Sequence, residues 1–314
     1  MNPDAVHADA ACRPGCHEGD EPAARSRATR AASCRLGPAI AVASRVLLRR
    51  SGFWFAALGV LSLALATFAT AQASTLEQIR QRGYMVVATQ EDFPPFEYRT
   101  SRGVIGFDNE LLLGLRTASG LEIRHKTGTL CEILAGVASG KYDVAATAVE
   151  ITQVHLKQLR FTRAIADLPM AYVKRQDDQS IVDATDLAKQ TVGVLRCSAA
   201  AATLAQSRTT LERSGTRLGD VIEYDNLAEA YQDLVSGHIR AVINNRASVS
   251  EIVRETSGLL EAGTLLGPKM QMAWAVQKRN DSVLAFINTY LERQRASGSL
   301  TRLRLKYGLL DDPL

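Results

Sequence analysis

Strand-like and helix-like segments alternate along the chain from Thr75 onward, and this alternation constrains the fold more than any other feature. Strand patterns such as "YMVVAT" (84–89) and "YDVAAT" (142–147) are separated by segments with apolar positions at helical spacing, among them 106–120. Strands that alternate with helices predict a mostly parallel sheet covered by helices, so the expected fold class is α/β. Asp108 is expected to cap the helix that ends at Gly120.

The later part of this pattern repeats the earlier part in outline. The segment 134–147, "LAGVASGKYDVAAT", and the segment 231–244, "YQDLVSGHIRAVIN", both indicate the end of a helix, a Ser-Gly pair and a strand. A length of 314 residues suits about two domains. We therefore expect two lobes of similar topology, followed by two amphipathic helices that divide at Gly298.

The start of the chain has the layout of an export signal. Residues 1–44 are rich in Ala, Arg and Ser without an apolar period, which predicts a disordered or overextended leader. Residues 45–73 then show a basic flank, an uncharged apolar run and an A-x-A cleavage site that ends at Ala71 or Ala73. An uncleaved membrane anchor is the alternative, because the apolar run approaches the length of a span. Cleavage would give a periplasmic protein that is not embedded in the membrane.

Charge and cysteine content narrow the function classes. Residues 1–73 hold 8 of the 37 Lys and Arg and 5 of the 33 Asp and Glu, which leaves 29 and 28 for the rest of the chain. Such a balanced chain gives no electrostatic argument for binding nucleic acid. Two of the five cysteines, Cys131 and Cys197, lie beyond the signal, and their spacing matches no zinc pattern.

The loop "EDFPPFEY" (91–98) directly follows the first strand. Its two prolines fix the chain in an extended path, and its three aromatic rings are costly to expose. The loop is therefore either a rigid turn whose rings enter the local core or a ligand platform. Open α/β sheets bind small molecules at the carboxyl ends of their strands, where this loop lies.

Several segments in order make the chain similar to a type 2 periplasmic solute-binding protein of the polar amino-acid group (family 3). They are "LEQIRQRGYMVVAT", "DFPPFEY", "GVIGFDNEL", "VASGKYDVAAT", "EITQVHLKQLRFT", "LAKQTVGVL", "LAEAYQDLVSGHIRAVI", "FINTYL" and "SGSLTRLRLKYG". The resemblance implies a two-lobed clamshell with a two-crossing hinge. Lobe 1 would hold 75–168 and 275–314, and lobe 2 would hold 169–274. The crossings would lie near Ile165–Pro169 and Met272–Ala275.

The resemblance also implies a ligand site. Its positions in this chain are Gln90, Phe93, Leu130, Ala148, Glu150, His155, Ser198 and Asn245. The ring of Phe93 would stack on the ligand, and Pro94 and Pro95 would stiffen the loop that presents it. Phe96 and Tyr98 are assigned to the core of lobe 1.

The chain departs from the family where a charged ligand would be held. His155 stands where an Arg usually binds a ligand carboxylate, and Asn245 stands where an Asp usually binds an ammonium group. Glu150 replaces a small residue, and Ser198 keeps the one hydroxyl of an anion-binding turn at 197–199. An ordinary zwitterionic amino acid is therefore not expected as the ligand. Purely structural roles also stay open. His155 could cap or pack against its helix, Asn245 could hydrogen-bond the backbone of its own loop, and Glu150 could be a solvated surface carboxylate.

Cys131 and Cys197 occupy rim positions of opposite lobes in this resemblance. We expect two unrelated cysteines that act as small hydrophobes. A disulfide across the cleft is one alternative, and it would lock the clamshell and argue against reversible uptake. A metal site formed with His155 and Glu150 is the other alternative.

The predicted function is that of a periplasmic solute-binding protein that closes on a small molecule and delivers it to an inner-membrane ABC permease. No cofactor is expected, and the protein is expected to be a monomer. One rival is an enzyme similar to cyclohexadienyl dehydratase, which the missing Arg disfavours. A second rival is a sensory or partner-docking relative on the same fold.

Overall fold

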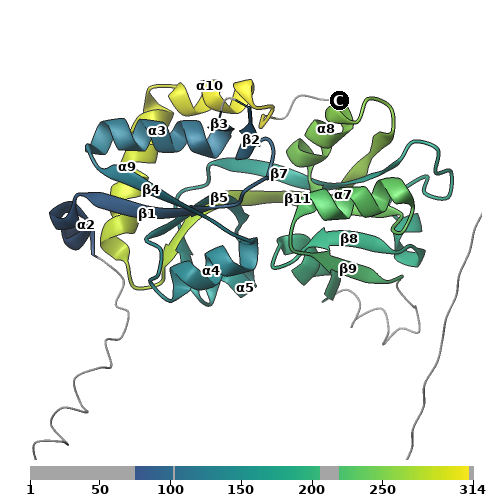
Figure 1. The fold of residues 1–314 in the computed structure, drawn as a ribbon, viewed down its shortest axis with the longest axis horizontal. Helices are drawn as coiled ribbons and strands as arrows, with labels where there is room; N and C mark the ends of the chain where they lie inside the picture. Colours follow the sequence, from purple (N-terminus) through teal and green to yellow (C-terminus); the bar gives the residue numbers. More distant parts are fainter. Residues whose placement is uncertain (1–74, 102, 206–218, 311–314) are drawn as a thin grey trace, which may run out of the picture. The chain divides into compact units, whose positions relative to one another are not determined.

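The computed structural model describes residues 75–310 except 102 and 206–218 (Figure 1). The predicted leader 1–44 and signal segment 45–73 lie outside the described residues. The helices are α2 (Leu76–Arg82), α3 (Phe107–Ser119), α4 (Leu130–Ala138), α5 (Gln153–Leu156), η1 (Asp186–Lys189), α7 (Leu227–Ser236), α8 (Arg246–Glu255), α9 (Asp281–Ala296) and α10 (Ser299–Lys306). The strands are β1 (Tyr84–Thr89), β2 (Tyr98–Thr100), β3 (Gly103–Ile105), β4 (Glu122–Thr127), β5 (Val144–Glu150), β6 (Leu159–Phe161), β7 (Ala166–Arg175), β8 (Val192–Leu195), β9 (Val221–Tyr224), β10 (Ala241–Asn245) and β11 (Leu260–Gln277).

The larger sheet has two parallel ends joined by antiparallel strands. Its order is β4-β1-β5-β11-β7-β10-β8-β9, with β6 paired to β11. Strands β4, β1 and β5 are parallel and form what we call the first half, and the parallel strands β10, β8 and β9 form the second half. This mostly parallel, helix-covered arrangement confirms the α/β fold class.

The chain passes between the halves through β7 and β11. Strand β11 pairs with β7 over most of its length and with β5 near its end, so that Met272 lies opposite both Ala166 and Glu150. The resemblance placed the crossings near Ile165–Pro169 and Met272–Ala275, which overlap these two strands. The exact lobe boundaries, at 168/169 and 274/275, stay a prediction.

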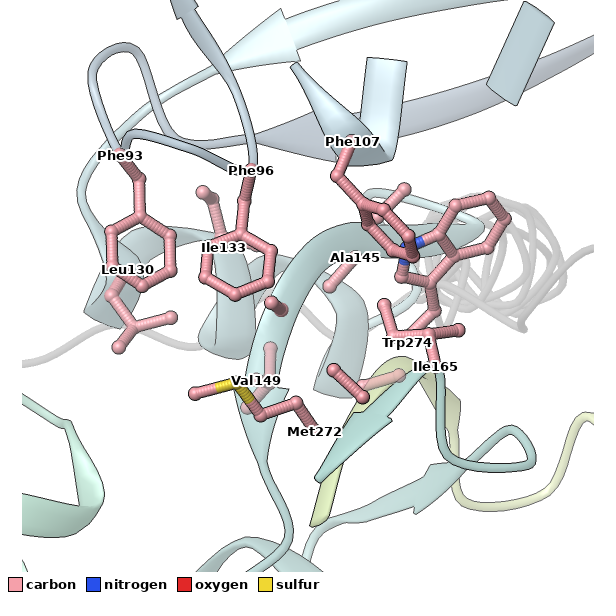
Figure 2. Close-up of a cluster of buried hydrophobic side chains, with 14 of the residues drawn as sticks. Phe93, Phe96, Phe107, Leu130, Ile133, Ala145, Val149, Ile165, Met272 and Trp274 are labelled. Carbon is pink, nitrogen blue, oxygen red and sulfur yellow. The ribbon is translucent and has the colours of Figure 1, made fainter. Parts of the chain in front are cut away.

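Helices cover both faces of the first half. Figure 1 shows α3 and α10 on one side of β1 and β4, with α4 and α5 on the other. Helix α4 begins at a capping box, in which Thr129 and Glu132 each bond the backbone N–H of the other. A continuous apolar cluster fills the interior of this half and extends into the second half, and Figure 2 shows part of it around β5.

The start of α3 corrects one prediction. The helix is capped by Gly106, whose φ of 124° and close approach to the carbonyl oxygen of Phe96 leave no room for a Cβ atom. Asp108 is not the cap. It lies fully buried in the first turn, where its Oδ1 accepts a hydrogen bond of 2.6 Å from the indole of Trp274. This distant partner, and not the local helix, determines the position of the Asp108 side chain.

None of the helices in the described residues is both long and apolar enough to cross a membrane.

Candidate functional site

The eight predicted ligand residues lie at the carboxyl ends of strands or in the segments that follow them. Gln90 follows β1, Glu150 ends β5 and Asn245 ends β10, while Ser198 lies three residues beyond β8. Every one of the eight is at most 8% exposed. The structure therefore buries all eight of these residues.

The aromatic loop after β1 packs into the first half. The rings of Phe93 and Phe96 are stacked with centroids 5.1 Å apart, and Phe107 meets Phe96 edge-on at 6.3 Å. Figure 2 shows the ring of Phe93 against Leu130 at the start of α4. Stacking of Phe93 on a ligand stays a prediction. Tyr98 was wrongly assigned to the core, because it is half-buried and lines a surface groove together with residues of α7 and α8.

A buried acid pair supports this loop from behind. Gln90 donates its backbone N–H to Glu97 and its side-chain amide to Thr147, at 3.1 and 3.0 Å. Glu97 and Asp108 are both buried, and burial raises the pKa of both carboxyls, that of Asp108 to about 7, while repulsion from Asp108 adds to the shift of Glu97. Two adjacent buried carboxyls are stable when they share a proton. Sequence reasoning missed this pair, although an acidic residue between Phe96 and Tyr98 was a usable signal.

His155 links the two halves of the sheet. Its Nδ1 lies 2.9 Å from the backbone oxygen of Glu150 in the first half. Its Nε2 lies 3.0 Å from the backbone oxygen of Cys197, which follows β8 in the second half. The ring thus does more than pack against its own helix, as one reading of the sequence proposed.

Glu150 is buried at the carboxyl end of β5, where its side chain is only 3% exposed. Burial raises the pKa of Glu150, while backbone N–H groups near its carboxyl and the nearby His155 oppose that shift. The reading of Glu150 as a surface carboxylate is therefore wrong. Ser198, beside Ala199, uses its hydroxyl to cap the backbone N–H of Ala201 at 3.2 Å.

Asn245 is a helix cap rather than a free amide. Its side-chain oxygen accepts the backbone N–H of Ser248 at 3.0 Å, and its amide donates to the Ser248 hydroxyl at 3.1 Å. That hydroxyl donates in turn to the backbone oxygen of Pro94, 2.7 Å away in the aromatic loop. A chain of polar contacts therefore ties the start of α8 to the loop after β1.

Cys131 and Cys197 form a disulfide, with Cα atoms 5.5 Å apart. The expectation of two unrelated cysteines is wrong, because the first turn of α4 and the turn after β8 meet across the cleft. The bond also leaves no thiolates for the alternative metal site with His155. Among the described residues, no group of three or more His, Cys, Asp or Glu side chains could hold a metal ion.

A cavity of about 520 Å³ lies beside these contacts and is shared by the two halves. Gln90, Thr129 and Glu132 line it from the first half, and Asp225, Asn226 and Leu227 line it from the second. Glu91 and Asp92 also line this space. The pKa of Asp92 is raised, mainly by burial and to a smaller extent by repulsion from Glu91. The charged residues of the lining are four acids, Glu91, Asp92, Glu132 and Asp225, and one cation, Arg99.

The sequence profile of the bacterial extracellular solute-binding proteins, family 3, matches residues 85–309. The chain belongs to this family. Its fold is the two-lobed type 2 periplasmic-binding-protein fold. An ancestral arginine-binding protein bound to glutamine superposes with a TM-score of 0.65 and 27% identity, over 72% of this chain and 98% of that one.

Two curated relatives differ in what their names describe. The chain is 26% identical to the L-cystine-binding protein TcyJ of Escherichia coli K12, over 80% of this chain and 94% of the relative. It is 25% identical to the membrane-bound lytic murein transglycosylase F of Stutzerimonas stutzeri, over 82% of this chain. The chain spans only about half of the transglycosylase, 52% of its length. This family-3 protein is therefore a ligand-binding protein by descent, on a fold that also forms part of larger proteins.

Proposed function

We propose that this family-3 protein is a monomeric periplasmic solute-binding protein of an ABC uptake system, exported through a cleaved signal peptide. One observation carries the proposal: a polar cavity that both halves line, next to Gln90 at the carboxyl end of β1. Such a cavity at the strand ends of an α/β sheet suits a small polar solute held by groups from both sides. Relatives named as L-cystine-binding and amino-acid-binding proteins support a solute of similar size.

The solute that fits has hydrogen-bond donors and no free α-carboxylate. His155 and Asn245, which stand where the family holds a carboxylate and an ammonium group, are both committed to partners within the chain. The cavity itself presents the carboxylates of Glu91, Asp92 and Glu132. A second carboxylate brought into this space would be repelled, whereas amide or amine donors would be accepted.

A thermal-shift panel tests this proposal. The common L-amino acids, including Arg, His and Gln, should change the unfolding temperature little at millimolar concentration. A solute that binds would stabilise the folded state by mass action and would therefore raise this temperature. Their uncharged amides and small polyamines form the second arm of the panel, and at least one class of them should bind. The panel is run on the oxidised and on the dithiol-reduced protein, since the disulfide spans the cleft. A shift of several degrees with an ordinary amino acid would refute the proposed solute class.

The disulfide favours a second candidate, a sensory or partner-docking protein that stays closed. A bond between Cys131 and Cys197 limits how far the halves can separate. Uptake requires a form that opens, which we assign to the reduced protein. Transport of a radiolabelled solute by cells with and without the gene separates the two candidates, because only the uptake role predicts a transport defect. The dehydratase-like role stays disfavoured, because His155 replaces the Arg expected to bind its substrate.

A further inference from the structure

The Cys131–Cys197 disulfide lies at the edge of the polar cavity. Glu132, the residue after Cys131, lines this cavity from the first half. Asp225 lines it from the second half and forms an ion pair with Arg196, the residue before Cys197, at an N–O distance of 2.8 Å. The bond therefore joins the two halves next to the space that we propose for the solute.

The two sulfurs of this bond differ in their access to solvent. Cys197 is exposed in the turn after β8, whereas Cys131 is half-buried in the first turn of α4. Thiol–disulfide exchange begins when a thiolate attacks one of the two sulfurs, and the attack requires access to that sulfur. An incoming thiol therefore reaches the bond from the side of Cys197.

The surroundings of Cys131 suit a departing thiolate. Cys131 is the second residue of α4, and the positive end of a helix dipole stabilises an anion in the first turn. The adjacent acid, Glu132, uses its carboxylate to accept the backbone N–H of Thr129 at 2.9 Å, at the N-cap of the helix. Because a thiolate at Cys131 is stabilised by the helix, Cys131 is the better leaving group of the pair.

The backbone of Cys197 is held in a conformation that favours release of the bond. Its φ of 63° lies in the left-handed region, which residues other than glycine rarely adopt. Such a conformation persists only where the surrounding structure supports it, and it is common at sites that change state. The bond to Cys131 is one of these supports, so its reduction lets the turn relax.

We propose that the Cys131–Cys197 disulfide is a thiol-exchange site, which an external dithiol reduces by attack on the sulfur of Cys197. The incoming thiolate bonds to this sulfur as the S–S bond breaks, and Cys131 leaves as a thiolate that takes up a proton. The second thiol of the dithiol then loses its proton and attacks the dithiol sulfur bound to Cys197, which releases Cys197 as a thiol. The dithiol is oxidised to a disulfide, and the chain gains two thiols.

Early exchange with a monothiol tests the direction of attack on the oxidised full chain. The probe is reduced glutathione, and acid stops the reaction at early times, before alkylation and peptide mass spectrometry. Glutathione should be bound to Cys197, with Cys131 as the free thiol, at least about tenfold more often than the reverse. In urea that unfolds the chain, this preference should disappear. Adducts divided evenly between the two cysteines of the folded chain, or found mainly on Cys131, would overturn the proposal.

Two matched arginine variants locate the side of entry. Arg196→Gln removes the cation next to Cys197, and Arg124→Gln removes a cation from β4, where the side chain is likewise 48% exposed and ion-paired. Because the attacking group is an anion, Arg196→Gln should slow the exchange about threefold, while Arg124→Gln should leave its rate unchanged. An equal effect of the two variants would contradict attack beside Arg196 and overturn the proposal.

Two dithiols distinguish the kinds of partner. Dithiothreitol and a reduced protein with a Cys-x-x-Cys site are each mixed with the oxidised chain, and the one that reduces it faster at equal concentration identifies the kind of dithiol that the site accepts. A folded chain that neither dithiol reduces would overturn the proposal. This activity goes beyond solute binding and needs no solute, so its test can succeed or fail independently of the thermal-shift panel.

Discussion

The two sides of the cleft are built from different interactions. The first side is the loop after β1, whose rings of Phe93 and Phe96 belong to a continuous apolar core with the buried Glu97–Asp108 pair behind them. The second side is made of helix starts, capped by Ser198 and Asn245. Apolar burial contributes more to stability per residue than a cap does. The first side is therefore held mainly by apolar packing, whereas the second side is held by caps and polar contacts.

Removing a ring from the first side should have the largest effect on stability. Phe96→Ala deletes a fully buried ring that contacts Phe93 and Phe107, and it should lower the free energy of unfolding by about 3–5 kcal/mol. Urea denaturation measures this loss. Leu305→Ala, at a position 62% exposed on α10, is the control and should change it by less than about 0.5 kcal/mol. A loss below about 1 kcal/mol for Phe96→Ala would show that the first side is not held mainly by apolar packing.

The acid pair should make the protein less stable as the pH rises from about 4 to 7. Burial raises the pKa of Asp108 to about 7 and also raises that of Glu97, whereas both titrate near 4 in an unfolded chain. The folded protein therefore holds an extra proton between about pH 4 and 7. Its stability should fall as the pH rises through this window, by up to about 1.4 kcal/mol per pH unit.

Glu97→Gln isolates this effect. The amide can donate to Asp108 without a shared proton, so the variant should lose much less stability than the wild type between pH 5 and about 7.5. Thermal unfolding across this range measures the difference. Glu122→Gln, on the exposed strand β4, is the control and should follow the wild type. Identical pH profiles for Glu97→Gln and the wild type would mean that the pair does not share a proton.

Removing a cap from the second side should have the smallest effect. Asn245→Ala removes the buried cap of α8 and loosens Ser248, which bonds Pro94 across the cleft, so it should cost about 1–2 kcal/mol. Asn226→Ala removes the exposed cap of α7 and should cost about 0.5–1 kcal/mol. The same denaturation assay compares them. An equal loss of stability for both variants would indicate that the Ser248–Pro94 hydrogen bond across the cleft contributes nothing to the free energy of unfolding.

Much of the fold could be predicted from local pattern. The alternation of strands and helices predicted the α/β class, which the sheet and its covering helices confirm. Asp108 was misread because its partner, Trp274, lies 166 residues away. The sequence likewise contains no sign that Glu150, His155 and the turn at 197–199 meet. Contacts between distant segments depend on the tertiary fold, which no local pattern encodes.

The central claim is that the chain's own groups hold the solute cleft shut and that reduction of the Cys131–Cys197 disulfide lets it open. Amide hydrogen exchange on the full chain, with and without dithiothreitol, tests this claim most directly. Reduction should speed exchange about tenfold or more in residues 91–97 and 197–201, while amides between β1 and β4 stay as slow as before. The double variant Cys131→Ser, Cys197→Ser should match the reduced protein without dithiol. Unchanged exchange in the two cleft segments after reduction, or faster exchange everywhere, would contradict the claim.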